Sequence, residues 1–207
     1  MASTASPYGL RAVNELGGLP YAGSTRSFLI DPAGYNTNIF NGSIVRLNTS
    51  GYLNIVTTNG DDSTPFPAGT IGVFVGCTYT NAQGQIIYSQ YYPANTASVQ
   101  GSAITAYVID DDRAVFQVQS AGTVSQAALG ANIYLNAVQS TSTGSTTTGN
   151  STTAVVIGSS AATTSGYAFR VVGFANTPGF STVGDAYTDI LVKFNPGAHS
   201  YSNATGI

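Results

Sequence analysis

Very few side chains in this sequence could do acid–base, nucleophilic or metal chemistry. The single His, His199, would have to serve any Ser-His-Asp triad, with a buried carboxylate orienting its ring. No Gly-x-Ser-x-Gly motif accompanies it, and it follows the last β-like run, so we predict an ordinary surface residue. The single Cys, Cys77, lies in an apolar run without a nearby cation, which predicts an inert core thiol. One His and one Cys are too few for a zinc site.

The carboxylates are also poorly arranged for chemistry. Asp110–Asp112 could offer oxygen ligands to Ca²⁺, but adjacent residues of a strand point to opposite faces. We therefore predict a solvated turn, with Arg113 offsetting the negative charge. Asp185 and Asp189 would lie about 13 Å apart along a strand, farther than the two carboxyl groups of a glycosidase. We predict no catalytic residues, no metal site and no cofactor, and hence a protein that is not an enzyme.

The composition excludes several classes of protein. Only 7% of the 207 residues are charged, against about 25% in an average soluble domain. Six cationic side chains and a net charge of −3 cannot follow a phosphate backbone, so we predict no nucleic-acid partner. The N-terminus lacks the features of a signal peptide, and no apolar run approaches the ~18 residues of a membrane span. We therefore expect synthesis in a cytoplasm and no membrane partner.

The few charges are unevenly distributed along the chain. Residues 63–109 and residues 114–169 contain no charged side chain. A surface built from Thr, Ser, Asn, Gln and Tyr can meet other proteins at a lower desolvation cost than one built from Lys or Glu. The alternative is that such a composition only makes a soluble surface that is insensitive to salt, and the sequence leaves both interpretations open.

Most of the chain alternates short β-like runs with turn residues. Helical periodicity is confined to Val124–Leu129, which Gly130 would close. The pattern predicts an all-β fold, an antiparallel β-barrel or sandwich of jelly-roll-like form. The predicted strands are Arg26–Ile30, Ser43–Leu47, Tyr52–Thr57, Thr70–Tyr79, Gln85–Tyr91, Ala103–Asp110, Ala114–Gln119, Asn132–Val138, Tyr167–Phe174 and Asp189–Phe194.

Two segments fall outside this strand pattern. Residues 1–25 contain Gly, Pro and scattered apolar residues, which predicts an extended N-terminal arm. Residues 26–207 are then a single β-rich domain. Within it, residues 139–153 are rich in Thr and Ser, and we favour an exposed loop there. An extended strand is the alternative, because Thr is β-branched.

Five short strings are spread over most of the chain, from the N-terminal segment to the last predicted strand. They are Pro20–Arg26, Thr37–Gly42, Ile71–Cys77, Gln90–Pro93 and Gly184–Asp189. Together they resemble strings in the capsid decoration (cement) proteins of tailed phages, especially podoviruses of aquatic bacteria. The resemblance implies a structural virion protein, a β-rich homotrimer at local threefold positions on the outer capsid surface. There it would bind the major capsid protein and stabilise the shell.

A cement protein of this kind needs surfaces that pair with the shell and with its own copies. We predict that the arm carries much of this binding, because an extended segment dotted with apolar residues can add a strand or fill a groove. The residues predicted to contact the capsid or a neighbouring subunit are Leu10, Arg11, Val13, Leu16, Pro20, Tyr21 and Arg26.

The alternative is a carbohydrate- or receptor-binding module of a phage fibre. Loops rich in Tyr and Asn suit sugar faces, and such modules are also β-rich and poor in charge. The absence of Trp and of a fibre-like repeat argues against this function. An enzyme, such as a glycosidase on a β-scaffold, is the third alternative.

Overall fold

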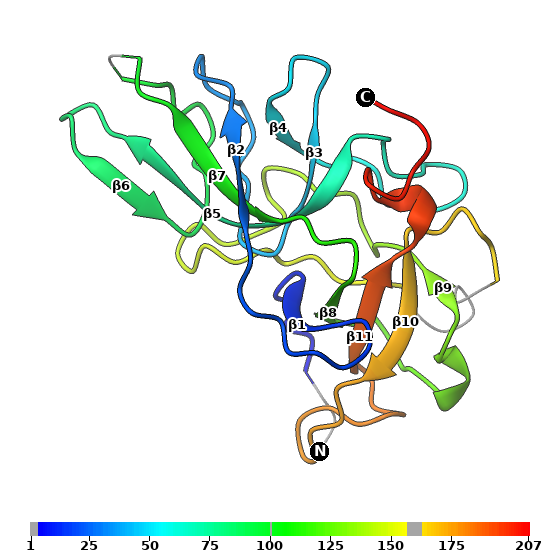
Figure 1. Ribbon diagram of the computed structural model, residues 1–207. Coiled ribbons are helices and arrows are strands. Elements are labelled where there is room, and N and C mark those ends of the chain that lie inside the picture. The colour runs from blue at the N-terminus through cyan, green and yellow to red at the C-terminus, as the bar shows by residue number, and fades with distance from the viewer. Residues whose placement is uncertain (1–3, 100, 157–162) are drawn as a thin grey trace.

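The chain folds into two antiparallel sheets that pack together as a sandwich (Figure 1). The computed structural model describes residues 4–99, 101–156 and 163–207. One sheet has the strand order β1-β8-β11-β10-β9, and the other has the order β2-β7-β5-β3-β4, with β6 also pairing to β5. The predicted all-β, antiparallel architecture is thus confirmed. The strands are β1 Arg11–Glu15, β2 Arg26–Ile30, β3 Ile44–Leu47, β4 Leu53–Ile55, β5 Thr70–Thr80, β6 Ile86–Ser89, β7 Ile104–Ile109, β8 Ala114–Gln119, β9 Asn132–Ile133, β10 Phe169–Phe174 and β11 Asp189–Phe194.

Helical structure is slight in the described ranges. It consists of two 3₁₀ turns, Gln126–Ala128 and Pro196–Ala198. The first lies inside the predicted helical run Val124–Leu129 and is shorter than that run. Among the described residues, no helix is long and apolar enough to cross a membrane.

The main core lies between the two sheets. At its centre, Phe194 contacts Phe116 and Phe169 at ring-centroid distances of 5.8 and 4.8 Å. The opposing sheet contributes Ile44 and Val73 to the same buried cluster. Phe116 and Phe194 come from strands whose inward residues alternate with outward ones, as the two-residue period of a strand requires. Full burial of each such side chain stabilises the fold by about 1.5–3 kcal/mol.

A second, smaller core covers the opposite face of the β2-β7-β5 part of the sheet. Cys77 and Ala106 pack there beneath the loops that carry Tyr35 and Tyr92. The hydroxyl of Tyr92 donates to the carbonyl of Thr96 at 2.8 Å and accepts the N–H of Tyr35 at 2.9 Å. This face of the sheet is therefore closed by connecting loops and not by a third sheet.

The N-terminal segment is extended in backbone but is part of the sandwich. Arg11–Glu15 form β1, which pairs antiparallel with β8. Leu10 is buried in the main core, and its N–H donates to the carbonyl of Gly42 at 3.0 Å. The structure does not show the separate arm predicted for residues 1–25. This stretch supplies an edge strand instead, because β8 would otherwise expose a row of unpaired backbone groups.

The Thr/Ser-rich segment 139–153 is a loop, as predicted, but part of it packs inward. Gln139 is only 2% exposed. Its side-chain oxygen accepts the N–H of Ile44 at 2.8 Å, and its amide nitrogen lies 3.1 Å from each of the carbonyl oxygens of Ile44 and Val56. Ser151 and Thr153 are also buried, with their hydroxyl oxygens 2.8 Å apart. The expectation of an exposed loop is wrong for these residues, because their side chains satisfy polar groups inside the fold.

Candidate functional site

The Cys77 thiol is a core group, which confirms its prediction. Its side chain is buried in the smaller core, and its Sγ lies 3.5 Å from the carbonyl oxygen of Tyr91. Burial raises the pKa of the Cys77 thiol to about 12. The reactive thiolate is therefore scarce at neutral pH.

His199 is 1% exposed, so its predicted surface position is wrong. Its ring packs edge-on against Phe194 and Tyr201, with centroid distances of 5.5 and 5.3 Å. Nδ1 accepts the N–H of Tyr201 at 3.3 Å. Burial lowers the pKa of His199, and the nearby charge of Asp112 partly opposes this effect. The prediction failed because the chain folds back over His199 after β11. No pattern in the neighbouring residues indicates this arrangement.

Asp110 is buried and organises a cluster that holds the end of the chain. Its Oδ2 lies 2.8 Å from Nη1 of Arg26 and accepts the hydroxyl of Tyr201, also at 2.8 Å. Nη1 of Arg26 also donates to the hydroxyl oxygen of Tyr201 at 2.7 Å. Asp112 accepts the hydroxyl of Ser202 at 2.8 Å. The turn predicted to be solvated is therefore partly buried, since it anchors the C-terminal residues to β2.

Asp185 and Asp189 have separate structural partners. Asp185 accepts the N–H and the hydroxyl of Thr182 at 2.8 and 2.7 Å, and these hydrogen bonds lower its pKa. Asp189 accepts the hydroxyl of Tyr8 at 3.0 Å and the side-chain N–H of Gln117 at 3.3 Å. In the part of the chain that the structure describes, no group of three or more His, Cys, Asp or Glu side chains is placed to hold a metal ion.

The fold separates the seven residues predicted to contact a shell or a neighbouring subunit. Leu10 belongs to the chain's own core, and Arg26 is paired with Asp110. Val13 is half-buried, and so is Tyr21, which packs against the main core. Leu10 is thus buried within the chain, whereas the side chain of Arg26 is 61% exposed and reaches the surface despite its ion pair.

The remaining predicted contact residues lie on the surface around β1. Arg11 is exposed and its guanidinium lies over the ring of Tyr8, 4.9 Å from the centroid. Leu16 and Pro20 are exposed in the turn that follows β1, together with Leu19. This turn, residues 16–20, is the part of the predicted arm that still presents apolar side chains to solvent.

One part of the second sheet extends beyond the first sheet (Figure 1). At that end, β2, β7, β5 and β6 lie side by side, and the hairpin of β5 and β6 projects farthest from the β1-β8-β11 sheet. The register aligns one residue of each strand in a single row: Leu29, Thr105, Thr78 and Tyr88. Side chains directly opposite on neighbouring strands point to the same face of a sheet. We call this surface the open face and define it by Leu29, Thr78, Ile86, Tyr88, Thr105 and Tyr107.

The open face presents large apolar side chains to solvent. Leu29 is 49% exposed, Ile86 65% and Tyr88 79%. The hydroxyl of Tyr107 lies 3.1 Å from the Oγ1 of Thr78, so even the polar groups of this face partly satisfy one another. None of its six residues is charged. Thr105 and Thr78 lie between Leu29 and Tyr88 in the row, so the face combines apolar and neutral polar side chains, and another macromolecule can cover it without desolvating a charge.

A depression of about 380 Å³ adjoins the open face. Tyr88 and Tyr107 line it, with Val75, Gly76 and Gln90 among the other lining residues. Five of the six open-face residues lie within the charge-free stretch 63–109, but that stretch does not by itself distinguish them from its other residues.

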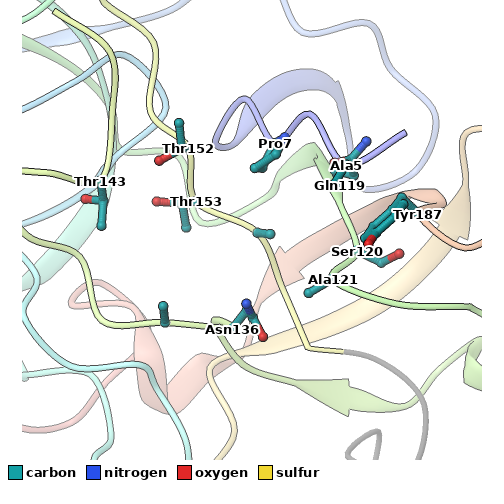
Figure 2. A pocket seen from close by; sticks show the side chains of 12 residues that line it. Ala5, Pro7, Gln119, Ser120, Ala121, Asn136, Thr143, Thr152, Thr153 and Tyr187 are labelled. Carbon is teal, nitrogen blue, oxygen red and sulfur yellow. The ribbon is translucent and has the colours of Figure 1, made fainter. Parts of the chain in front are cut away.

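A second candidate site is a cavity of about 310 Å³ beside the Thr/Ser-rich segment (Figure 2). Thr143, Thr152 and Thr153 lie on one side of it, and Ser120 and Tyr187 lie on the other. Its remaining lining residues are Ala5, Pro7, Gln119, Ala121, Asn136, Ala137 and Ala154. Because the lining holds hydroxyl, amide and methyl groups without a formal charge, the cavity suits a small neutral polar ligand.

Comparison with known protein families, curated proteins and solved structures finds no match. A functional conclusion for this chain therefore depends on the geometry and chemistry of the open face and of the cavity.

Proposed function

We propose that this chain is a structural virion protein, a capsid decoration or cement protein that binds the outer surface of a phage head. The observation that supports this proposal is the open face, a neutral sheet surface with three large apolar side chains in water. A surface of that kind gains hydrophobic free energy when another protein covers it, and it loses no charge solvation. The sequence resemblance points to the same role.

The proposed partners are the major capsid protein and further copies of this chain in a homotrimer. The open face would lie against the shell, and the exposed turn at residues 16–20 would provide a second contact. Binding through several copies around a threefold axis would raise the effective concentration of each contact, so individually weak contacts would suffice. The site of action would be the outer capsid surface in the virion.

The proposal is tested by measuring how much of the chain binds purified heads of the phage that encodes it. Leu29→Asp places a charge on the open face and should lower the affinity at least about tenfold, because the carboxylate would be desolvated on binding. Leu129→Asp is a matched control, since Leu129 is also 49% exposed but lies outside the open face. Equal binding of the two variants would refute the role of the open face, and absence of binding by the unmodified chain would refute the proposed function.

A carbohydrate-binding module remains the second candidate, and the neutral cavity favours it. Thr152 and Asn136 are exposed at this cavity and could donate to or accept from sugar hydroxyls. The discriminating measurement is binding to an array of neutral oligosaccharides. Micromolar binding that Asn136→Ala abolishes would favour this function, whereas an array without signal would exclude it.

A further inference from the structure

The outer edge of β6 lacks the features that usually protect an edge strand. One side of Ile86–Ser89 pairs with β5, and no described strand pairs with the other side. Figure 1 shows β6 at the margin of the molecule, with no other element beyond it. Edge strands are normally blunted by charged residues, by proline or by bulges. The four residues of β6 include neither charge nor proline, so its outer edge is open to pairing with another strand.

The hairpin between β5 and β6 determines which backbone groups point outward. The N–H of Asn81 donates to the carbonyl of Gln85 at 2.9 Å, so this pair is hydrogen-bonded. Bonded and non-bonded pairs alternate along an antiparallel ladder. Ile87 is therefore bonded to β5, whereas the N–H and C=O groups of Ile86 and Tyr88 face away from it. These two residues are also the exposed apolar residues of β6.

We propose that β6 pairs antiparallel with β6 of a second copy of this chain, across a twofold axis centred on Ile87. In this register, Ile86 of each chain lies opposite Tyr88 of the other. The outward N–H and C=O groups of these two residues then meet complementary groups of the second copy. Each Ile86–Tyr88 contact pairs a β-branched side chain with an aromatic one, which is a favourable cross-strand combination. Ile87 lies opposite Ile87 on the other face of the joined sheet.

The self-complementary register and the absence of charge favour a second copy as the occupant. A strand without charged residues pairs with its own copy without like-charge repulsion, and residues 63–109 are free of charge. The alternative twofold register, centred on Tyr88, would place Ile86 opposite Gln90. Gln90 lies beyond the end of β6, and its amide nitrogen already donates to Asn150 at 2.9 Å. The register centred on Ile87 uses only residues within the strand.

This contact goes beyond the proposed function, because it concerns copies of the chain free in solution. It also has a consequence for larger assemblies. A twofold contact on a subunit that also forms trimers would connect neighbouring trimers. The pairing of one short strand buries a small area, so isolated chains should associate weakly and reversibly.

Disulfide trapping tests the register directly. Residues opposite each other in a non-hydrogen-bonded antiparallel pair have Cα atoms about 4.5 Å apart, within the range for a disulfide. Ile87→Cys should therefore form a cross-linked dimer under mild oxidation. Ile86→Cys alone and Tyr88→Cys alone should not form a cross-linked dimer. In this register, residue 86 of one copy is two residues along the strand from residue 86 of the other copy, and the same holds for residue 88. An equimolar mixture of the last two variants should cross-link. Cys77 should remain unreactive, because it is buried.

The outcomes of this experiment are decisive when circular dichroism shows that the variants fold. If Ile87→Cys stays monomeric on a non-reducing gel, or if Tyr88→Cys cross-links faster than Ile87→Cys, the proposed pairing is wrong. The cross-linking experiment does not involve phage heads, so its result does not depend on the proposed function.

Sedimentation of the chain without engineered cysteines provides an independent test. Tyr88→Lys should weaken self-association at least about tenfold, since it removes both Ile–Tyr contacts and brings two positive charges near the axis. Phe180→Lys is the matched control, because Phe180 is 78% exposed and lies outside β6. A monomer at every concentration of the unmodified chain, or equal association of the two variants, would overturn the proposal.

Discussion

His199 shows how a single side chain can make the fold sensitive to pH. Burial lowers its pKa below the ordinary value of 6.5, while Asp112, Asp110 and Asp111 act in the opposite direction. The unfolded chain therefore binds a proton at a higher pH than the folded chain does. The contribution of His199 to the free energy of unfolding is therefore complete above the pKa that His199 has in the unfolded chain. It is lost as the pH falls from about 6.5 toward the pKa that His199 has in the folded chain.

We expect the urea midpoint of the unmodified chain to decrease between about pH 7.5 and pH 5. His199→Gln should remove the part of this decrease that comes from the imidazole, because the amide does not titrate. The measurement is a series of urea unfolding curves for both proteins over this pH range. If the urea midpoints of the two proteins decreased by the same amount over this pH range, His199 would not contribute to the pH dependence.

Gln139 is the second residue whose effect can be predicted from its contacts. Gln139→Ala leaves the N–H of Ile44 and the carbonyl of Val56 without their side-chain partner, whereas the carbonyl of Ile44 still accepts the N–H of Val56 at 3.0 Å. Each buried polar group left unpaired costs about 1–3 kcal/mol, so we expect a loss of about 3 kcal/mol in the free energy of unfolding. Gln83→Ala, at an exposed turn, should change it by less than about 0.5 kcal/mol. Chemical denaturation measures both values, and a similar loss in the two variants would contradict this account.

At the scale of elements, the N-terminal strand should contribute to stability as well as to any contact. Leu10→Ala removes a buried side chain of the main core and should cost about 3 kcal/mol. Leu19→Ala is the control, because Leu19 is exposed in the turn after β1 and should cost less than about 0.5 kcal/mol. Thermal unfolding compares the two variants. A small effect of Leu10→Ala would indicate that the segment detaches easily, as a free arm would.

The elements also show where sequence reasoning is reliable. The runs at Arg26–Ile30, Ala114–Gln119 and Asp189–Phe194 match β2, β8 and β11 residue for residue. Asn132–Val138 shrinks to the two residues of β9, and β1 was missed inside a segment with many glycines. The matching runs have strong alternation and β-branched or aromatic residues, whereas β1 depends on pairing with a strand about a hundred positions away.

At the scale of the whole molecule, the lack of charge on the open face predicts how the proposed binding to phage heads depends on salt. Screening by salt weakens contacts between charges but leaves hydrophobic contacts nearly intact. We therefore expect the affinity for heads to change less than about threefold between about 0.05 and 0.5 M NaCl. Binding isotherms at several salt concentrations test this. A steep decrease with salt would point to a charged surface, such as the region of Arg11, in place of the open face.

The sequence by itself determined the all-β class, the buried thiol and the scarcity of charge, because strand periodicity and composition are local properties. Only the tertiary structure decided that His199 is buried, that the N-terminal segment is an edge strand and that Gln139 serves the backbone of Ile44, 95 positions away. The open face also emerged only there. Its residues come from four strands, and whether a face stays uncovered depends on how far one sheet extends past the other, which local patterns do not encode.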